Sequence, residues 1–310
     1  MGDPKRVTLN DVAAASGVSR ATVSFVLRNS PGQSISAATR ERVRQAARDL
    51  GYVPNGIARA LREGSSRIVV LSLDATLDGH YARSYVRGLD SELAAHDHVL
   101  LVRYEHPASE SARQMLDAIG PRAVLRFGEP YLTGHELDDS GGGWKDGLAA
   151  HVGAQLGYLA DRGHTRVALA LSDRETPLRD VRLRFANQAA GMLGLVPVAA
   201  FVVPVSRTAA ADSLSEFRSA RSEVTAVAAF DDDIALRVLA AARDLGLAVP
   251  DDLAVIGFDE NEYGALATPA LTTVHIDAEA HGRQAARAIL GLDPAGPTPA
   301  PGRVVVRESA

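Results

Sequence analysis

The sequence predicts an α/β protein in two parts, a small all-α segment followed by a larger body of parallel sheets. Short helical patterns with capping residues fill the first 54 residues. From Arg67 onward, apolar strand-like runs alternate with amphipathic helical segments, which is the pattern of parallel sheets covered by helices. The charge distribution also changes at this place. Residues 1–64 contain ten Lys/Arg and five Asp/Glu and are therefore basic, whereas the whole chain has a formal net charge of −5.

Length and composition limit the class of protein. The chain has 310 residues, which is enough for about two domains. It contains no cysteine, so disulfides and thiolate metal sites are excluded. No apolar run reaches the ~18 residues that span a bilayer, and the N-terminus is polar, so we expect a cytoplasmic protein. We expect neither a cofactor nor a metal. The basic segment fits either a polyanionic partner or an ordinary solvated surface.

The first segment has the pattern of a helix-turn-helix. Thr8 is placed to cap a helix, with Asp11 at the reciprocal capping position. Gly17 interrupts the pattern where a turn needs a positive φ. Ser19 then caps a second helix that extends to about Leu27. Two short helices joined by a three-residue turn containing glycine predict this motif.

In such a motif the second helix enters the major groove with its N-terminal residues on base edges and phosphates. The candidate DNA contacts in this part are Thr8, Ser19, Arg20, Ala21, Thr22, Ser24 and Phe25. The alternative is a small helical hairpin that binds nothing.

A third helix is predicted from after Ser36 to about Leu50. Val43 and Ala47 lie on its buried stripe, and arginines occupy its exposed side. Gly51 ends the helix and Pro54 prevents it from resuming. A short segment, 55–62, precedes Gly64-Ser65-Ser66.

These blocks resemble a known headpiece and hinge. TLNDVAAASGVSRATVSFVL, followed by SAATRERVRQAARDLGYVPNGIARALR, is similar to the lac repressor (LacI/GalR) family of bacterial transcription regulators. The resemblance implies a homodimer whose hinge segments form paired helices in the minor groove, each inserting a leucine, here Leu61, between base pairs. Eight residues with a glycine cannot hold a helix alone, so the hinge would order only against DNA and its partner. The alternative for Leu61 is packing against the body. The resemblance adds these candidate DNA contacts: Arg28, Asn29, Asn55, Ala58, Arg59 and Leu61.

The body is predicted to contain two parallel sheets, since it has more strands than one sheet would normally hold. The expected strands are 68–73, 99–102, 123–125, 167–171, 200–203, 226–230, 254–258 and 303–308. The expected helices are 81–96, 109–119, 147–162, a segment from about Val181, 212–221, 233–245 and 277–290.

The body also resembles the core of the same family, which is similar to periplasmic sugar-binding proteins with a ligand cleft between two lobes. The clearest match covers residues 226–274, including FDDDIALRVLAAARDLGLAVPDDLAVIGFDE and LATPALTTV. The expected domains are a helix-turn-helix domain (1–54), a hinge (55–65) and an effector-binding and dimerisation domain (66–310). Within the last, we expect a first lobe of about 66–162 and 275–292 and a second of about 163–274 and 303–308.

Ligands of such sheets bind beyond the carboxyl ends of the strands. Asp231 and Asp259 follow apolar strands, and the resemblance implies that Asp259 and Arg184 contact an effector. The candidate effector contacts are Asp74, Tyr81, Asp180, Arg184, Asp231 and Asp259. The alternative is that they are strand-end turn residues or helix N-caps.

The middle of the chain departs from the family. An Asp-Asn element usually precedes the helix that matches 147–162, and here residues 137–144 read LDDSGGGW instead. The first lobe therefore looks shortened and one of its strands looks absent. Trp144 is either a stacking platform for a ligand or a packing anchor.

Together these features favour a sequence-specific transcription repressor that is not an enzyme. Its operator affinity would respond to a small polar effector, sugar-like or nucleoside-like. Two other classes of protein fit the sequence less well. A solute-binding protein is disfavoured by the basic N-terminal segment, and an enzyme by the lack of a nucleophile with an adjacent base.

The family usually has Arg at the position of Phe25 and Asn at that of Arg28. Phe25 cannot donate to guanine but can pack on a thymine methyl. We therefore predict that Phe25→Arg changes the half-site recovered when the protein selects duplexes from a random library. An unchanged motif would contradict this prediction.

Overall fold

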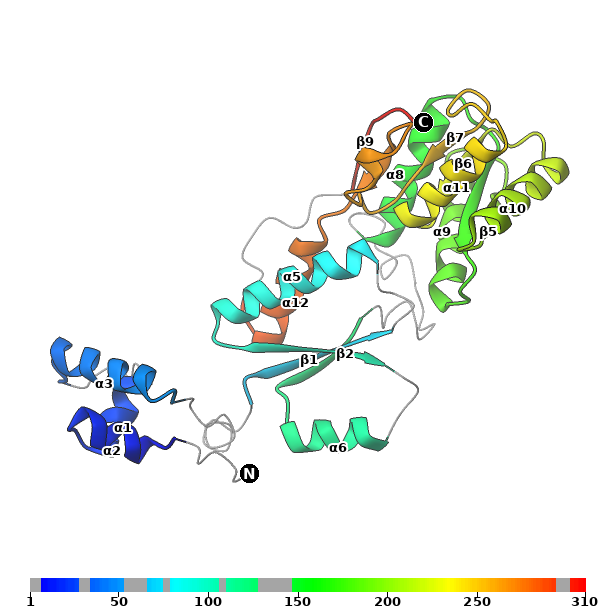
Figure 1. Cartoon of the computed structure of the whole chain (residues 1–310). Coiled ribbons are helices and arrows are strands. Elements are labelled where there is room, and N and C mark those ends of the chain that lie inside the picture. Colours follow the sequence, from blue (N-terminus) through cyan, green and yellow to red (C-terminus); the bar gives the residue numbers. More distant parts are fainter. Residues whose placement is uncertain are drawn as a thin grey trace. The chain divides into compact units, whose positions relative to one another are not determined.

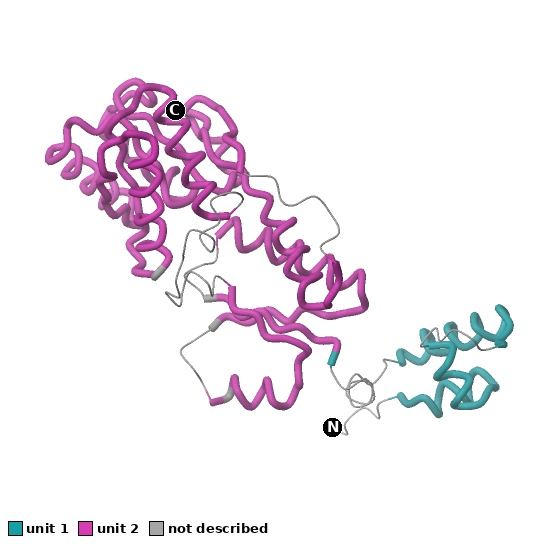
Figure 2. Tube along the Cα trace, turned by 180° about the vertical axis from the view of Figure 1, so that it is seen from behind, with its two compact units in different colours: residues 1–66 teal, residues 67–310 magenta. Residues whose placement is uncertain are grey.

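The computed structural model describes residues 7–27, 34–52, 66–74, 79–105, 110–127, 147–293 and 302–310. It divides into two compact units, Met1–Ser66 and Arg67–Ala310, which are coloured separately in Figure 2. Each unit has its own hydrophobic core.

The first unit is helical, with α1 (Leu9–Ser16), α2 (Arg20–Leu27) and α3 (Ala37–Asp49). The backbone N–H of Thr8 donates to the Asp11 carboxylate at 2.7 Å, which caps α1 as its sequence predicts. Gly17 ends α1 at a φ of 66°, the left-handed conformation that glycine adopts without strain. The hydroxyl of Ser36 accepts a hydrogen bond from the N–H of Thr39 and caps α3.

One small core holds these helices together. Val12 of α1, Val23 and Val26 of α2, and Val43 of α3 are buried at its centre. Arg42 of α3 adds a polar tie, because its Nε donates to the carbonyl of Ser16 at 2.9 Å. That carbonyl lies in the last turn of α1, where the helix has no partner for it.

The second unit contains two parallel sheets, as predicted. In the first, β1 (Ile68–Asp74) lies between β2 (Val99–Glu105) and β3 (Ala123–Arg126). The second has the order β5-β4-β6-β7, formed by β4 (Val167–Ser172), β5 (Ala199–Val203), β6 (Ala226–Ala229) and β7 (Ala254–Ile256). An antiparallel pair, β8 (Thr273–His275) and β9 (Arg303–Val305), adjoins it, and the N–H of Val255 donates to the carbonyl of Ser309.

Alternate residues of the second sheet face opposite layers of helices. Leu169, Ala228 and Ile256 pack against α8 (Leu148–Asp161) and α9 (Pro177–Met192). Ala170, Val227 and Val255 pack against α10 (Arg207–Ala220) and α11 (Asp232–Asp244). Figure 1 shows α8, α9, α10 and α11 around this sheet. Helix α9 begins earlier than the expected Val181, because Pro177 occupies its first turn after Thr176.

The first sheet is covered by α5 (His80–Ala95) and α12 (Ala278–Leu290), while α6 (Glu110–Ile119) connects β2 to β3. Figure 1 shows α5 and α12 side by side. None of the helices in the described ranges has the length and apolar character needed to cross a bilayer.

Two glycines let α5 and α12 approach until their backbones touch. A Cβ on Gly88 would lie 2.0 Å from the carbonyl oxygen of Glu279. A Cβ on Gly282 would lie 2.1 Å from the carbonyl oxygen of Tyr85. Any side chain at either position would therefore push the helices apart.

We predict that Gly282→Ala lowers the free energy of unfolding by about 1–3 kcal/mol, because the added methyl group overpacks a backbone contact. Urea unfolding of the full chain measures this change. Gly153→Ala is the matched control, since Gly153 lies within α8 and a Cβ there would meet nothing within 4 Å. The control should be neutral or stabilising by about 1 kcal/mol, because alanine is the better helix former. Equal effects of the two substitutions would contradict the close crossing.

Candidate nucleic-acid interface and ligand site

The outward face of α2 carries the residues that the sequence predicts for DNA contact. Arg20 and Ala21 are exposed, and Thr22, Ser24 and Phe25 are half-buried, while Val23 and Val26 turn into the core. Ser19 precedes the helix, and its hydroxyl lies 2.9 Å from that of Thr22 and accepts a hydrogen bond from the N–H of Thr22. These short polar groups at a helix N-terminus are suited to bind phosphate.

The remaining predicted DNA contacts fall into two groups. Thr8 is exposed, and its hydroxyl donates to the Asp11 carboxylate at 2.7 Å, so it is part of the cap of α1. The others lie outside the described residues and stay predictions: Arg28, Asn29, Asn55, Ala58, Arg59 and Leu61.

The arginines of the first unit differ in their partners. Arg42 bonds to the Ser16 carbonyl, and Arg40 donates to the carbonyl of Ile35. Arg48 pairs with Glu41 at 2.7 Å on the exposed side of α3. Within the described ranges, Arg20 has no hydrogen bond or ion pair. Arg20 is therefore the cation of α2 that is available to a phosphate or a guanine.

In the second unit, a buried arginine lies at the carboxyl ends of the strands. Arg182 of α9 is 2% exposed, and its Nη2 donates to the carbonyls of Ala229 and Phe230 at 3.1 Å. Its guanidinium carbon lies 3.6 Å from the centre of the Phe258 ring, a cation–π contact. Its Nε and Nη1 are buried and have no hydrogen-bond partner among the described residues. Burial lowers the pKa of Arg182 to about 9, and the carboxylates of Asp231 and Asp259 act in the opposite direction.

The structure places Arg182 in this position, whereas the sequence comparison with the family selects Arg184. Arg184 is exposed on α9, with its guanidinium carbon 5.7 Å from the ring of Phe185. The reason is the phase of the helix, because Val181, Arg182 and Phe185 share its buried face. Asp180 is also exposed on α9. Arg184 and Asp180 thus lie on the exposed face of α9, whereas Arg182 lies on its buried face.

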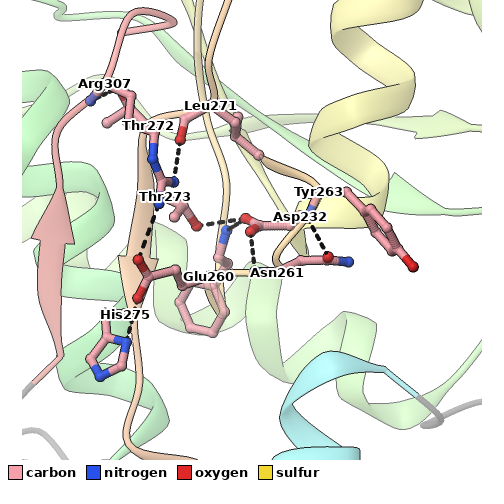
Figure 3. Close-up of polar contacts among 10 residues, drawn as sticks. Asp232, Glu260, Asn261, Tyr263, Leu271, Thr272, Thr273, His275 and Arg307 are labelled. Atoms are coloured by element: carbon pink, nitrogen blue, oxygen red, sulfur yellow. Dashed lines mark hydrogen bonds and ion pairs between the residues drawn. The ribbon is translucent and has the colours of Figure 1, made fainter. Parts of the chain in front are cut away.

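Two adjacent aspartates after β6 have different roles. Asp231 is the N-cap of α11, because its Oδ1 accepts a hydrogen bond from the N–H of Ile234 at 2.7 Å. Asp232 is fully buried, and its carboxylate accepts hydrogen bonds from the N–H of Phe258, the N–H of Asn261 and the hydroxyl of Thr273 (Figure 3). Burial raises the pKa of Asp232 to about 7, while these donors act to lower it.

The loop after β7 holds an unusual backbone. Asp259 has a φ of 94° and Glu260 a φ of 52°, values that residues with a Cβ rarely adopt. The bonds to Asp232 hold both sides of this turn, and the side chain of Glu260 pairs with His275 and Arg307 (Figure 3). Local strain held in place by surrounding bonds is typical of functional sites.

Asp259 is the predicted ligand contact that the structure leaves unsatisfied. Its side chain is 8% exposed, and its Oδ1 has no hydrogen-bond partner in the described part of the chain. Burial raises the pKa of Asp259 well above its ordinary value, and the neighbouring Asp232 and Asp231 add to this effect. The backbone N–H of Tyr81, at the start of α5, bonds to the Asp259 carboxyl group.

Tyr81 connects this strand end to the helices on the first sheet. Its hydroxyl lies 2.9 Å from Nδ1 of His281 on α12. The structure thus brings together Tyr81, Asp231 and Asp259 of the predicted effector contacts, with Arg182 beside them. The side chain of Asp74, and Trp144, lie outside the described residues.

Two polar residues of α8 were not predicted for this site. His151 is 3% exposed, and its ring centre lies 6.3 Å from that of Phe258. Gln155, one turn later, donates from Nε2 to the carbonyls of Ala229 and Gly257 at 2.9 Å and accepts from Arg182 at 3.4 Å. Both interrupt the apolar stripe of Val152, Leu156 and Leu159, and that interruption was the available sequence signal.

Two family models match this chain, one in each of its two parts. Residues 8–55 match the family model of bacterial regulatory proteins, lacI family, and residues 156–310 match that of the periplasmic binding protein-like domain. The transcriptional regulator GntR of Pseudomonas aeruginosa is 30% identical over 320 residues, covering 93% of this chain and 89% of its own. The repressor CytR of Escherichia coli K12 is 28% identical over 290 residues, covering 86% of this chain and 84% of its own.

A solved structure has the same fold over nearly the whole length. The lac repressor dimer bound to operator and the anti-inducer ONPF matches with a TM-score of 0.74 at 22% identity, covering 98% of this chain and 99% of that one. The chain belongs to the lacI family of bacterial regulatory proteins. It is a DNA-binding transcription regulator with a helix-turn-helix N-terminal unit and a periplasmic-binding-protein-like body, so the predicted family and fold class are confirmed.

We predict that Asp232→Asn lowers the free energy of unfolding by about 1–3 kcal/mol. The amide NH2 would replace one acceptor oxygen and leave a buried backbone N–H, such as that of Asn261, without its partner. Chemical unfolding of the full chain measures the change. Asp212→Asn, an exposed position on α10, is the control and should stay within about 0.5 kcal/mol of the parent protein. Equal stability of both variants would contradict the role given to Asp232.

Proposed function

We propose that this regulator is a homodimeric, cytoplasmic repressor whose affinity for a pseudo-palindromic operator is set by a small polar effector. The effector would bind at the carboxyl ends of β4, β6 and β7. One observation supports the proposal of an effector site: Asp259 Oδ1 and the Nε and Nη1 atoms of Arg182 are buried and have no hydrogen-bond partner in the described chain.

The DNA part rests on the exposed face of α2. Arg20 can donate to guanine or phosphate, Thr22 and Ser24 can bond to phosphate oxygens, and Phe25 can contact a thymine methyl. The lac repressor dimer with which this chain shares its fold is bound to operator. We propose the same dimeric arrangement here, with Leu61 of each hinge as the minor-groove wedge.

The effector part rests on unmet hydrogen bonding. A buried donor or acceptor without a partner costs about 1–3 kcal/mol, so a ligand that supplies partners is held strongly. A hydroxyl can accept from Arg182 and donate to Asp259. The regulator CelR, which has the same fold at 24% identity and a TM-score of 0.61, is in complex with cellobiose. These points support a sugar-like or nucleoside-like effector.

Coupling of the two parts requires that the effector prefer one arrangement of the body. Tyr81 offers a physical link, because its N–H meets Asp259 while its hydroxyl meets His281 on α12. A ligand that engages Asp259 would therefore act directly on α5 and α12. An enzyme is not proposed, because the matched relatives are transcription regulators.

The DNA part is tested by selecting duplexes from a random library and measuring the affinity of the recovered sequence by fluorescence anisotropy. Arg20→Ala should weaken binding about 10- to 100-fold, because it removes a contact made at the groove. Arg48→Ala removes the same charge from a residue already paired with Glu41, and it should change affinity less than about threefold. Affinity of the parent protein should fall steeply between about 50 and 200 mM salt.

The proposal would fail if the full-length protein recovered no duplex over random competitor, with or without small molecules. A sedimentation mass of four chains at low micromolar concentration would contradict the proposed dimer.

A further inference from the structure

His151 is a buried histidine whose position the fold does not explain. Its side chain is 3% exposed, and its Nε2 finds no hydrogen-bond partner among the described residues. Gln155, one turn further along the same stripe of α8, does have partners, because its Nε2 donates to the carbonyls of Ala229 and Gly257. A buried imidazole nitrogen without a partner lowers the stability of the fold, which indicates a role other than folding.

The imidazole lies within the cluster that contains the other unpartnered atoms. The Phe258 ring is shared, because the Arg182 guanidinium stacks on it at 3.6 Å and the His151 ring lies edge-on to it at 6.3 Å. Asp259 follows Phe258 directly. The ring of His281, which bonds to Tyr81, is 6.3 Å from that of His151. Unpartnered atoms from α8, α9 and the loop after β7 thus surround one aromatic ring.

Close packing restricts the imidazole to this position. A Cβ on Gly302 would lie 2.4 Å from Cδ2 and 3.2 Å from Nε2 of His151, and 3.1 Å from the carbonyl oxygen of His275. The chain entering β9 therefore passes directly over the imidazole, and only glycine fits there. A held side chain of this kind is suited to discriminate between ligands.

The charges around His151 favour a ligand without charge. Burial, with His281 and Arg182 nearby, lowers the pKa of His151 to about 4, so the imidazole is neutral at pH 7. Arg182 interacts with Asp231 and Asp259, a second cation, Arg237, acts on Asp231, and Asp232 is a third carboxyl group close to Asp259. An anionic ligand would add a further negative charge beside these carboxyl groups. An uncharged hydroxyl can donate or accept, so it matches a carboxylate, a guanidinium and either imidazole tautomer.

Resting on the proposed function, we propose that His151 is a specificity-determining residue of the effector site, and that the site selects an uncharged ligand with adjacent hydroxyl groups. One hydroxyl would bond to Nε2 of His151, while others engage Arg182 and Asp259. The ring that carries these hydroxyls belongs either to a free sugar or to the ribose of a nucleoside.

The variant His151→Leu separates a binding role from a structural one. Leucine has a similar volume and removes the unpartnered atom, so the unliganded protein should unfold at the same or a higher temperature. Ligand binding should weaken at least tenfold. His151→Gln restores a polar group and should recover part of the binding. His164→Leu is the matched control, because His164 lies just beyond the other end of α8 and bonds to Thr225.

The experiment uses the full chain, thermal shift and calorimetry. The probes are D-glucose, cellobiose, uridine and adenosine, with D-gluconate and uridine monophosphate as anionic counterparts. We expect at least one uncharged probe to bind the parent protein and the His164→Leu variant equally and its anionic counterpart to bind at least tenfold more weakly. Comparison of the sugar probes with the nucleoside probes shows whether the ring that carries the hydroxyl groups belongs to a free sugar or to the ribose of a nucleoside.

Four results would overturn the inference. They are equal or tighter binding of an anionic counterpart, full binding by His151→Leu, a loss of stability in unliganded His151→Leu, and no binding of any uncharged probe. Affinity for the selected duplex is measured on the same samples. If the protein binds DNA normally but binds none of the probes, the inference about His151 is wrong, and the proposed DNA binding still stands. If the probes bind as expected but the protein prefers no duplex, the proposed function is wrong, and the role of His151 still stands.

A titration of the imidazole resonances by NMR gives an independent readout. His151 should stay neutral from pH 7.5 to 5, while a solvated histidine titrates near pH 6.5. Because its folded-state pKa is depressed, the stability that it contributes is present above about pH 6.5 and is lost as the pH falls toward 4. His151→Leu should lack this part of the pH dependence. A His151 that titrates above pH 6 would contradict the inference.

Discussion

The buried carboxylate of Asp232 determines the geometry of the strand ends in the second unit. It lies at the start of α11, yet its hydrogen bonds reach the loop after β7 and the strand β8. The backbone at Asp259 and Glu260 has positive φ and would relax without bonds on both sides. Asp232 therefore fixes the direction of the Asp259 side chain, although Asp232 has no free oxygen to offer a ligand.

Polar residues placed on apolar helix faces supply the rest of the site. Gln155 of α8 and Arg182 of α9 donate hydrogen bonds to the Ala229 carbonyl at the end of β6. Without these donors, that buried carbonyl would lose hydrogen-bond partners. Gln155 uses its donors to bind backbone carbonyls, whereas the Nε and Nη1 atoms of Arg182 have no hydrogen-bond partner among the described residues. The atoms that hold the strand ends and the atoms proposed to bind the effector are thus neighbours, and in Arg182 they belong to one side chain.

The sequence predicted the fold class and part of the candidate site, but it grouped residues 147–162 with the first lobe, whereas α8 packs on the second sheet. Capping at Thr8, the break at Gly17 and the apolar runs of the body have local physical causes, and local patterns predicted them. Arg182 was not among the predicted contacts, because the resemblance indicates Arg184; the helical phase shared with Val181 and Phe185 places Arg182 on the buried face of α9. The different roles of Asp231 and Asp232 could not be predicted, since they depend on a loop 26 residues further along the chain.

The contact of α5 with α12 has a mechanical consequence. Where Gly88 and Gly282 meet the opposite backbone, no layer of side chains separates the two helices. Side chains can absorb a displacement by changing rotamer, but a backbone in direct contact has no such compliance. A push on Tyr81 at one end of α5 would therefore displace both helices as a single stiff rod, and little of the movement would be dissipated in repacking.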